Sequence, residues 1–299
     1  MQEARAVPSA IWKKFEENPV LSGEAGTQEA WTADPSVLFK AGVYHMWYTG
    51  AGKHPWRVFH ARSSDGLRWQ KTGPVNEVGH RVSVVHRGGK YHMYLAHGGY
   101  DPDFQLQVSD RPEGPFEDVA TVLRPDEPWE GDRLYCPDVI YDEEADLWKM
   151  WYSAKTIRAG SGWPEPEAVG YATSEDGVCW SKHEGNPIVG PRADVPWMKR
   201  AVCTLMVVKH EGRYCGFANV VGEDGRSRIA MGESADGIDW DLGPGSLILD
   251  LGGAGDFDAS HLFAPSAVRG ARGWMLWYNG KCAEEGSAVE SIGGACGQS

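Results

Sequence analysis

The amino-acid sequence predicts an all-β fold, a five-bladed β-propeller whose N-terminal strand completes the last blade. Three observations carry this prediction: a strand-turn-strand segment recurs five times, the composition suits strands and turns, and the start of the chain repeats an outer-strand motif. The chain contains 14 Trp, 11 Tyr and 38 Gly among its 299 residues. Aromatic residues favour strands and glycine favours turns, so this composition is typical of an all-β protein.

The repeated unit is a short apolar strand, a turn with glycine or acidic residues, and an aromatic strand, which is the pattern of a β-hairpin. Its five copies occupy residues 34–48, 81–95, 136–152, 204–217 and 264–278. Their aromatic strands are anchored 47, 57, 66 and 60 residues apart, at Tyr44, Tyr91, Trp148, Tyr214 and Trp274. Each interval can hold four short strands, so the repeat predicts five propeller blades.

In three copies the expected third strand ends at an Asp-Gly pair and the fourth opens at a tryptophan. These are Asp65-Gly66 with Trp69, Asp176-Gly177 with Trp180, and Asp236-Gly237 with Trp240. Asp-Gly is a strong turn signal, so we interpret these pairs as turns rather than as catalytic groups.

The fifth copy lacks an outer strand, because the chain ends soon after residues 291–295. Residues 11–21 closely match residues 179–189, sharing Trp-x-Lys and Asn-Pro. We therefore expect the N-terminal strand to close the ring and leave no open sheet edge. The sequence predicts a single domain over residues 1–299.

Charge and composition exclude several classes of partner. The chain has 29 Lys and Arg against 42 Asp and Glu, a formal charge of −13, which would repel nucleic acid and anionic membranes. It has neither a membrane-spanning apolar run nor a secretory signal at its start. The six cysteines have no metal-finger spacing and are interpreted as free thiols of a reducing compartment. We expect a cytoplasmic protein, a monomer or weak homo-oligomer, that uses a small-molecule or sugar substrate without cofactor or metal.

Two acidic motifs mark the starts of innermost strands: Asp34-Pro35 in the first copy and Pro137-Asp138 in the third. Five blades with these motifs resemble the glycoside hydrolase clan of arabinanases, β-xylosidases, invertases and levansucrases, over essentially the whole chain. The resemblance implies an axial pocket in which Asp34 is the base or nucleophile and Asp138 a second, orienting carboxylate. Glycoside hydrolysis needs such sets because one carboxyl group must be protonated while another is ionised.

The third carboxylate of the clan, the glutamic acid that acts as proton donor, is absent. Repeat alignment puts its position near Cys203, and no acidic residue occurs between Asp194 and Glu211. Invertase-like members carry a Glu-Cys-Pro motif, which this chain replaces by Tyr135-Cys-Pro. We therefore expect a non-standard acid, for which the candidates are Glu165, Glu167, Tyr135 and Asp138.

Basic residues stand at other innermost-strand starts. They are Arg81 with the adjacent His80, Arg200 with Lys199, and His261. Converging on one axis, they would suit a carboxylate, a phosphate or a charged sugar; alternatively they form structural salt bridges with Asp34, Asp138 or Asp258. The resemblance also places His261 where arabinanase-like members hold a channel metal, but one histidine without neighbouring ligands is a weak metal signal.

Five tryptophans fall in expected connecting loops, where exposed rings can stack on sugars. They are Trp31, Trp56, Trp129, Trp163 and Trp197. Trp31 and Trp197 are the preferred candidates because they adjoin innermost-strand starts.

Two classes of function follow. The first is a glycoside hydrolase-like enzyme acting on a small glycoside in the axial pocket, with Asp34 and Asp138 as catalytic residues. The second is a propeller diverted from hydrolysis, either a biosynthetic acid–base enzyme of cyclase or lyase type or a non-catalytic small-molecule or sugar-binding protein. The two aspartates favour the first class, and the missing glutamate favours the second.

Overall fold

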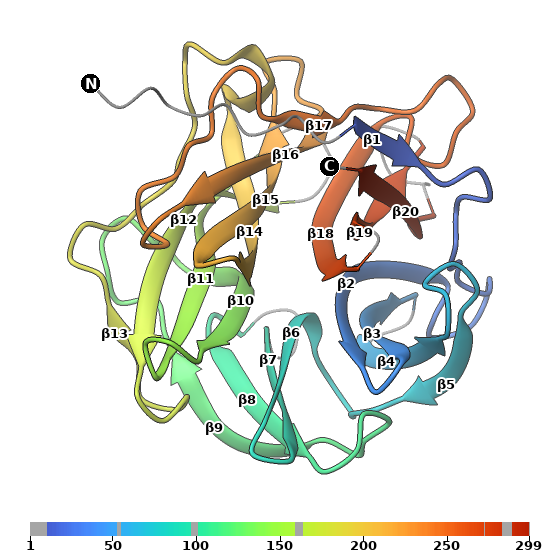
Figure 1. The fold of residues 1–299 in the computed structure, drawn as a ribbon, viewed down its shortest axis with the longest axis horizontal. Coiled ribbons are helices and arrows are strands. Elements are labelled where there is room, and N and C mark those ends of the chain that lie inside the picture. Colours follow the sequence, from blue (N-terminus) through green and yellow to red (C-terminus); the bar gives the residue numbers. More distant parts are fainter. Residues whose placement is uncertain are drawn as a thin grey trace.

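The computed structural model describes residues 11–52, 55–96, 101–158, 164–271, 273–282 and 289–298. These residues form five four-stranded antiparallel sheets arranged around a central axis, which confirms the predicted five-bladed β-propeller (Figure 1). Among the described residues, no helix has the length and apolar character needed to cross a membrane.

The first three blades follow chain order from the axis outward. Blade 1 contains β2 (Trp31–Lys40), β3 (Val43–Ala51), β4 (Arg57–Ser63) and β5 (Gln70–Pro74). Blade 2 contains β6 (His80–Arg87), β7 (Lys90–Ala96), β8 (Phe104–Ser109) and β9 (Glu117–Leu123). Blade 3 contains β10 (Leu134–Asp142), β11 (Leu147–Arg158), β12 (Pro164–Ser174) and β13 (Ser181–Lys182).

The last two blades differ in how they are completed. Blade 4 contains β14 (Ala201–His210), β15 (Arg213–Val221), β16 (Ser227–Ser234) and β17 (Leu247–Leu249), and the 3₁₀ helix η1 (Pro196–Met198) precedes it. Blade 5 contains β18 (His261–Gly270), β19 (Gly273–Lys281), β20 (Ser291–Gln298) and, outermost, β1 (Ile11–Lys14).

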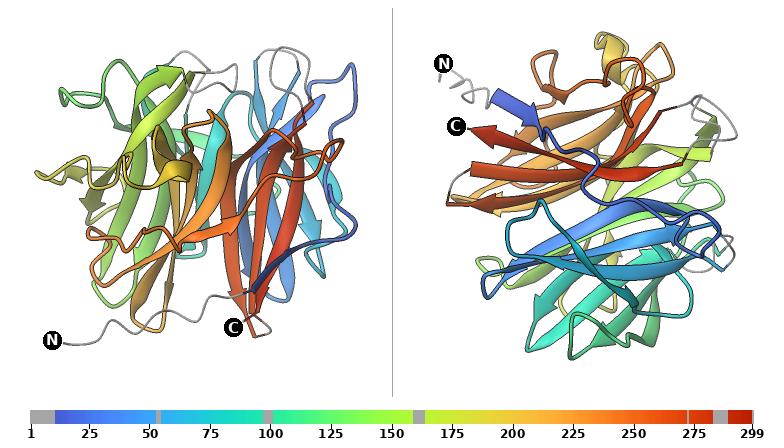
Figure 2. Two further views of the ribbon diagram at one scale, coloured as in Figure 1. Left: turned by 90° about the horizontal axis from the view of Figure 1, so that it is seen from above. Right: turned by 90° about the vertical axis from the view of Figure 1, so that its right-hand side faces the viewer.

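Strand β1 closes the ring as the sequence predicts, because it lies antiparallel beside β20 (Figures 1 and 2). Trp12 lies opposite Gly297, and Lys14 lies opposite Ala295. Further along, the Asn18 side chain donates to the Gly294 carbonyl at 2.9 Å and accepts from the Gly294 N–H at 2.8 Å. Asn186 makes the same pair of bonds to Tyr171 in blade 3, which explains why the Asn-Pro motif recurs.

The Asp-Gly pairs form turns, as the sequence predicts, and they also join neighbouring blades. In the first turn, Asp65 Oδ1 accepts hydrogen bonds from the N–H groups of Leu67 and Arg68 at 2.8 and 2.9 Å. The carbonyl of Gly66 accepts from the indole N–H of Trp277 in blade 5 at 2.9 Å. Trp151 donates in the same way to Gly237 of the next blade, so these buried rings fix the spacing between blades.

A β-bulge recurs at the start of every innermost strand and orients the side chains of the site. The ladder register shifts between Ala33/Ser36, His80/Ser83, Leu134/Pro137, Val202/Thr204 and Phe263/Ser266. Such a bulge bends the strand and redirects one side chain. At the bulge Asp34 and Arg81 have φ values of 50° and 52°, a strained conformation for non-glycine residues that is typical of functional sites.

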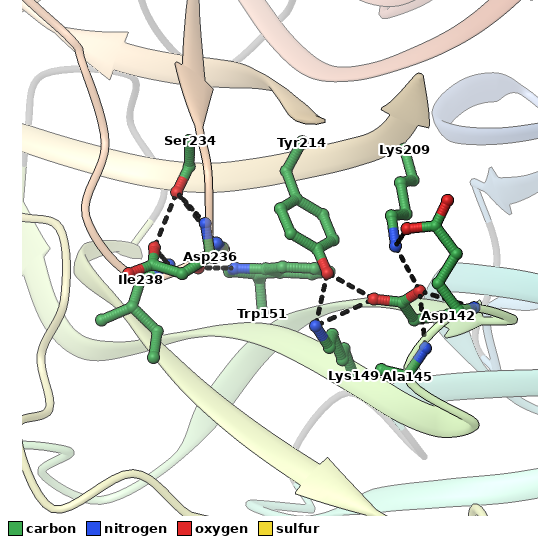
Figure 3. A network of polar contacts seen from close by, with 11 residues as sticks. Asp142, Ala145, Lys149, Trp151, Lys209, Tyr214, Ser234, Asp236 and Ile238 are labelled. Carbon is green, nitrogen blue, oxygen red and sulfur yellow. Dashed lines mark hydrogen bonds and ion pairs between the residues drawn. The ribbon is translucent and has the colours of Figure 1, made fainter. Parts of the chain in front are cut away.

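A buried ionic network joins blades 3 and 4 at the opposite ends of the innermost strands (Figure 3). Asp142 is 1% exposed, and its carboxylate lies 2.9 Å from Lys149 Nζ and 2.5 Å from Lys209 Nζ. The Tyr214 hydroxyl also donates to Asp142, while the Lys149 ammonium donates to Tyr214. Every charged member of the network thus has an oppositely charged partner, as a buried ion requires.

Candidate functional site

Two cavities lie along the axis and share the residues of the bulges. The site cavity, of about 440 Å³, is lined by loop and strand residues including Trp31, His80, Glu165 and Glu290. The channel cavity, of about 520 Å³, is lined by the innermost strands. The residues that line both cavities, and therefore form the layer between them, are Asp34, Arg81, Cys136, Thr204 and Ala264.

Asp34 is held on this layer by the neighbouring strand of its own blade. Its Oδ2 accepts a hydrogen bond from the Thr49 hydroxyl at 3.0 Å, and Thr49 Oγ1 accepts the backbone N–H of Arg81 at 3.0 Å. Burial raises the pKa of Asp34, while the charge of Arg81 and the bond from Thr49 oppose that rise. One threonine thus connects the acid of blade 1 to the base of blade 2.

Glu290 brings a second carboxyl group to the cavity from the connection that precedes β20. Asn279 Nδ2 donates to Glu290 Oε2 at 2.7 Å, and Asn279 Oδ1 accepts the backbone N–H of Asp34 at 3.3 Å. Burial, together with the negative charges of Asp34 and Glu165, raises the pKa of Glu290 to about 7. The cavity therefore contains a carboxyl group that holds its proton near neutral pH, one asparagine away from Asp34.

Arg81 occupies the blade 2 side of the same layer. Its guanidinium lies 3.9 Å from Glu165 Oε2 and 5.2 Å from the centre of the Tyr135 ring. The Tyr135 hydroxyl shares a 2.5 Å hydrogen bond with Thr156 Oγ1. Burial raises the pKa of the Cys136 thiol to about 12, so Cys136 stays a neutral thiol where the corresponding residue of blade 1 is a carboxylate.

Five residues expected at the site from the sequence line the site cavity: Asp34, Arg81, His80, Tyr135 and Trp31. Trp31, which was expected in a connecting loop, is instead the first residue of β2. The loop tryptophan Trp56 also lines the cavity and packs edge-on against His80 with ring centres 5.4 Å apart. One wall therefore offers aromatic faces as well as charged groups. Trp163 lies outside the described residues.

Asp138 lines the channel cavity and is not among the described residues that line the site cavity. Its Oδ2 accepts the Val207 N–H at 2.8 Å, and burial raises its pKa to about 7. Ser36, Ser83 and Ser266 accept the same bond from the next blade, at Val84, Val139 and Val37. Asp138 thus occupies the structural position of a serine in a ring of hydrogen bonds that joins the blades.

Four other expected site residues are not among the described residues that line either cavity. Arg200 is exposed, and Trp197 packs in η1 against the core between blades 3 and 4. Cys203 is 2% exposed in a small cluster with Ala201 and Val221. His261 is 2% exposed, contacts Ser227 Oγ at 3.2 Å and stacks on Phe263. Within the described residues, no three His, Cys, Asp or Glu side chains are grouped to hold a metal ion.

Sequence reasoning missed Glu290, Thr49 and Asn279. A signal for the last two exists, because a polar residue follows the aromatic pair of the second strand in three blades: Trp47-Tyr48-Thr49, Trp151-Tyr152-Ser153 and Trp277-Tyr278-Asn279. Glu290 has a counterpart in blade 3, because Gly293 pairs with Tyr278 as Gly170 pairs with Tyr152, and Glu290 and Glu167 each stand three residues before that glycine. Comparison of blades 3 and 5 could therefore have pointed to Glu290.

Comparison with known proteins supports the architecture. No protein-family model and no curated protein matches the chain. Among solved structures, it is similar to the catalytic domain of the Coprinopsis cinerea GH62 α-L-arabinofuranosidase, with a TM-score of 0.73, 11% identity and coverage of 97% of this chain and 98% of that one. It is also similar to Zg3597, a family 117 glycoside hydrolase of the marine bacterium Zobellia galactanivorans, with a TM-score of 0.68, 16% identity and coverage of 97% and 90%.

A thermostable family-43 glycoside hydrolase is a third similar structure, with a TM-score of 0.68, 18% identity and coverage of 92% of this chain and 91% of that one. At these identities the likeness concerns the fold. The chain therefore has the five-bladed propeller fold found in glycoside hydrolases of several families.

Proposed function

We propose that this protein is a glycosidase-like carbohydrate-active enzyme that acts on a small glycoside in the site cavity, with Asp34 as the ionised carboxylate and Glu290 as the proton donor. The observation that carries the proposal is the connection through Asn279, which bonds both the Asp34 backbone and the Glu290 carboxyl group. Glycosidic cleavage requires one protonated and one ionised carboxyl group with separated pKa values.

Glu290 supplies the non-standard acid in this proposal. Its pKa of about 7 leaves about half of the molecules protonated at neutral pH, whereas an ordinary glutamic acid would be ionised. Protonation by Glu290 would release the leaving oxygen, while the ionised Asp34 acts as nucleophile or activates water. Trp31 and Trp56 would stack on the sugar.

The other candidate acids suit this role less well. Glu165 is 7% exposed, and its Oε2 forms an ion pair with the Arg81 guanidinium at 3.9 Å. Glu167 forms an ion pair with Lys155 at 2.6 Å. Asp138 also has a raised pKa, but it lines the channel cavity, and its Oδ2 already accepts the backbone N–H of Val207.

A second candidate function is a biosynthetic acid–base enzyme of cyclase or lyase type, or a sugar-binding protein, using the same cavity. Cys136 favours it, because a neutral thiol occupies the axial position of blade 3 where blade 1 has Asp34. A cyclase or lyase would use Asp34 and Glu290 to move protons on a substrate that has no glycosidic bond, and a binding protein would use them to hold its ligand.

A panel of aryl glycosides with good and poor leaving groups tests the proposal. If Glu290 is the acid, Glu290→Gln should lose activity on the poor leaving groups by about 10²-fold or more and keep most activity on dinitrophenyl glycosides, which need little protonation. Glu167→Gln is the matched control and should resemble wild type. Turnover of no glycoside by the wild-type protein, with saturable sugar binding, would support the second candidate instead.

A further inference from the structure

The hydrogen bonds around Thr49 have a direction that the chemistry of the groups determines. The Arg81 backbone N–H can only donate, so the Thr49 oxygen that it contacts at 3.0 Å accepts. A hydroxyl has one hydrogen, and the acceptor that the described residues offer to the buried Thr49 hydrogen is Asp34 Oδ2 at 3.0 Å. The single Thr49 hydrogen is therefore committed to Asp34, whose Oδ2 must offer a lone pair.

The amide of Asn279 is oriented by the same reasoning. The Asp34 backbone N–H donates to it, so the facing atom is Oδ1, and Nδ2 is left to donate to Glu290 Oε2. Thr49 is 2% exposed and Asn279 is 1% exposed, so solvent does not replace either bond. In the hydrogen bonds that connect Arg81, Thr49, Asp34, Asn279 and Glu290, the donor and the acceptor of each bond are therefore fixed.

The two carboxyl groups differ in what stabilises their charge. Asp34 receives the Thr49 hydroxyl and faces the Arg81 guanidinium. Glu290 receives one neutral amide and faces Lys281, but it also faces the charges of Asp34 and Glu165. Cys136, on the innermost strand of blade 3, is a neutral thiol and adds no charge. A hydrogen bond to an ionised carboxylate favours ionisation, and a like charge nearby opposes ionisation of the second group.

We propose that Thr49 is a positioning residue whose hydroxyl, oriented by the Arg81 backbone, makes Asp34 the first and Glu290 the second carboxyl group of the pair to ionise. The ionised Asp34 then holds the proton on Glu290, since two coupled acids titrate as a pair. The use of this order in catalysis rests on the proposed function, but the order itself does not.

The order can be measured without any substrate. We suggest ¹³C NMR titration of the full-length protein labelled at Asp and Glu carboxyl carbons, with Asp34→Asn and Glu290→Gln used to assign the two signals. In the wild type, Asp34 should titrate at a lower pH than Glu290. Thr49→Val should raise the Asp34 midpoint by about one pH unit, a tenfold gain in proton affinity, and narrow the gap to Glu290.

Thr49→Ser keeps the hydroxyl and should keep the wild-type order. Ser266→Ala is the matched control, because it removes a buried hydroxyl that bonds Val37 of the same strand as Asp34 without contacting either carboxyl group. The proposal would be overturned if Glu290 ionised at a lower pH than Asp34 in the wild type. It would also be overturned if a folded Thr49→Val variant had the same titration midpoints as the wild type. If Thr49→Val does not fold, the order in which Asp34 and Glu290 ionise in the wild type still tests the proposal. Absence of glycoside turnover would refute the proposed function and leave this result standing.

Discussion

The Nζ atom of Lys14 lies 2.7 Å from Oδ2 of Asp258, so the outermost strand of blade 5 is tied to the loop before its innermost strand. The hydroxyl of Tyr278 in the second strand donates to the same carboxylate at 2.7 Å. Blades 1 and 3 repeat this triad as Lys71, Glu29 and Tyr48 and as Lys182, Glu130 and Tyr152. The start of the chain therefore completes blade 5 with the same contacts that hold complete blades together.

Deletion of residues 1–21 should destabilise the whole ring. The deletion removes β1, leaves the β20 edge unpaired and leaves the buried Asp258 without its cation. A loss of a few kcal/mol would lower Tm by about 10 °C, at roughly 2–4 °C per kcal/mol for a chain of this size. Thermal unfolding followed by circular dichroism measures the change, with deletion of residues 1–10 as the control. Equal melting of the two truncated proteins would contradict the closure argument.

Asp34→Asn should abolish most turnover while preserving the fold. Asparagine keeps the shape and can still accept the Thr49 hydrogen bond, but it cannot act as base or nucleophile. We expect kcat on an active aryl glycoside to fall by at least about 10²-fold. An unchanged circular dichroism spectrum and melting temperature would show that the fold is intact. A folded variant with undiminished kcat would remove Asp34 from the mechanism.

Activity should decline as pH rises through about 7, because the acid function of Glu290 requires its proton and its pKa is about 7. The decline should be steepest for glycosides with poor leaving groups. In Glu290→Gln the alkaline limb of the kcat/KM profile should disappear from the residual activity on dinitrophenyl glycosides. Persistence of the same limb in this variant would assign it to another group.

Asp142→Asn should lower the free energy of unfolding by about 3–5 kcal/mol at pH 7, because it leaves Lys149 buried with its opposite charge removed. Burial alone would raise the pKa of Asp142, but hydrogen bonds from Lys209, Tyr214 and Lys149 outweigh it and lower that pKa. The wild-type stabilisation is therefore present above the unfolded-state pKa of about 3.9 and is lost as pH falls below it.

Urea unfolding at several pH values measures this dependence, which the Asn variant should lack. The matched control is Glu144→Gln, which alters an exposed partner of Lys209 and should change stability by less than about 1 kcal/mol. Equal stability of Asp142→Asn and wild type would show that the network contributes nothing.

The sequence predicted the blades well because their signals are local. Asp65-Gly66 marks a turn through its own backbone bonds, and residues 11–21 repeat the pattern of an outer strand. The start of each innermost strand could also be located from the repeat. Of the residues expected to converge on one axial pocket, Asp34 and Arg81 line the site cavity, whereas Asp138 lines the channel cavity and Arg200 and His261 are not among the described residues that line either cavity.

Residues whose environment depends on neighbouring blades could not be placed from local pattern. Asp138 stands two residues after Cys136, which lies in the layer between the two cavities. A step of two residues keeps a side chain on the same face of the strand and moves it along the axis, so Asp138 lines the channel cavity. In blade 5 Phe263 takes the position that His80 has in blade 2, and His261 stands two residues earlier, where it is buried against Ser227 and Phe263.

By itself the sequence determined the number of blades, their closure by the N-terminal strand and the presence of Asp34 at the axis, because repeats and turns are encoded in short segments. Only the tertiary structure brought Glu290 and Asn279 of blade 5 beside Asp34 of blade 1. Asp34 and Asn279 are 245 positions apart in the sequence. Closing the ring places blade 5 against blade 1, and burial in the cavity they share then raises the pKa of Glu290. Neither effect has a signature in the residues next to Glu290, since both arise from groups that meet only when the ring is closed.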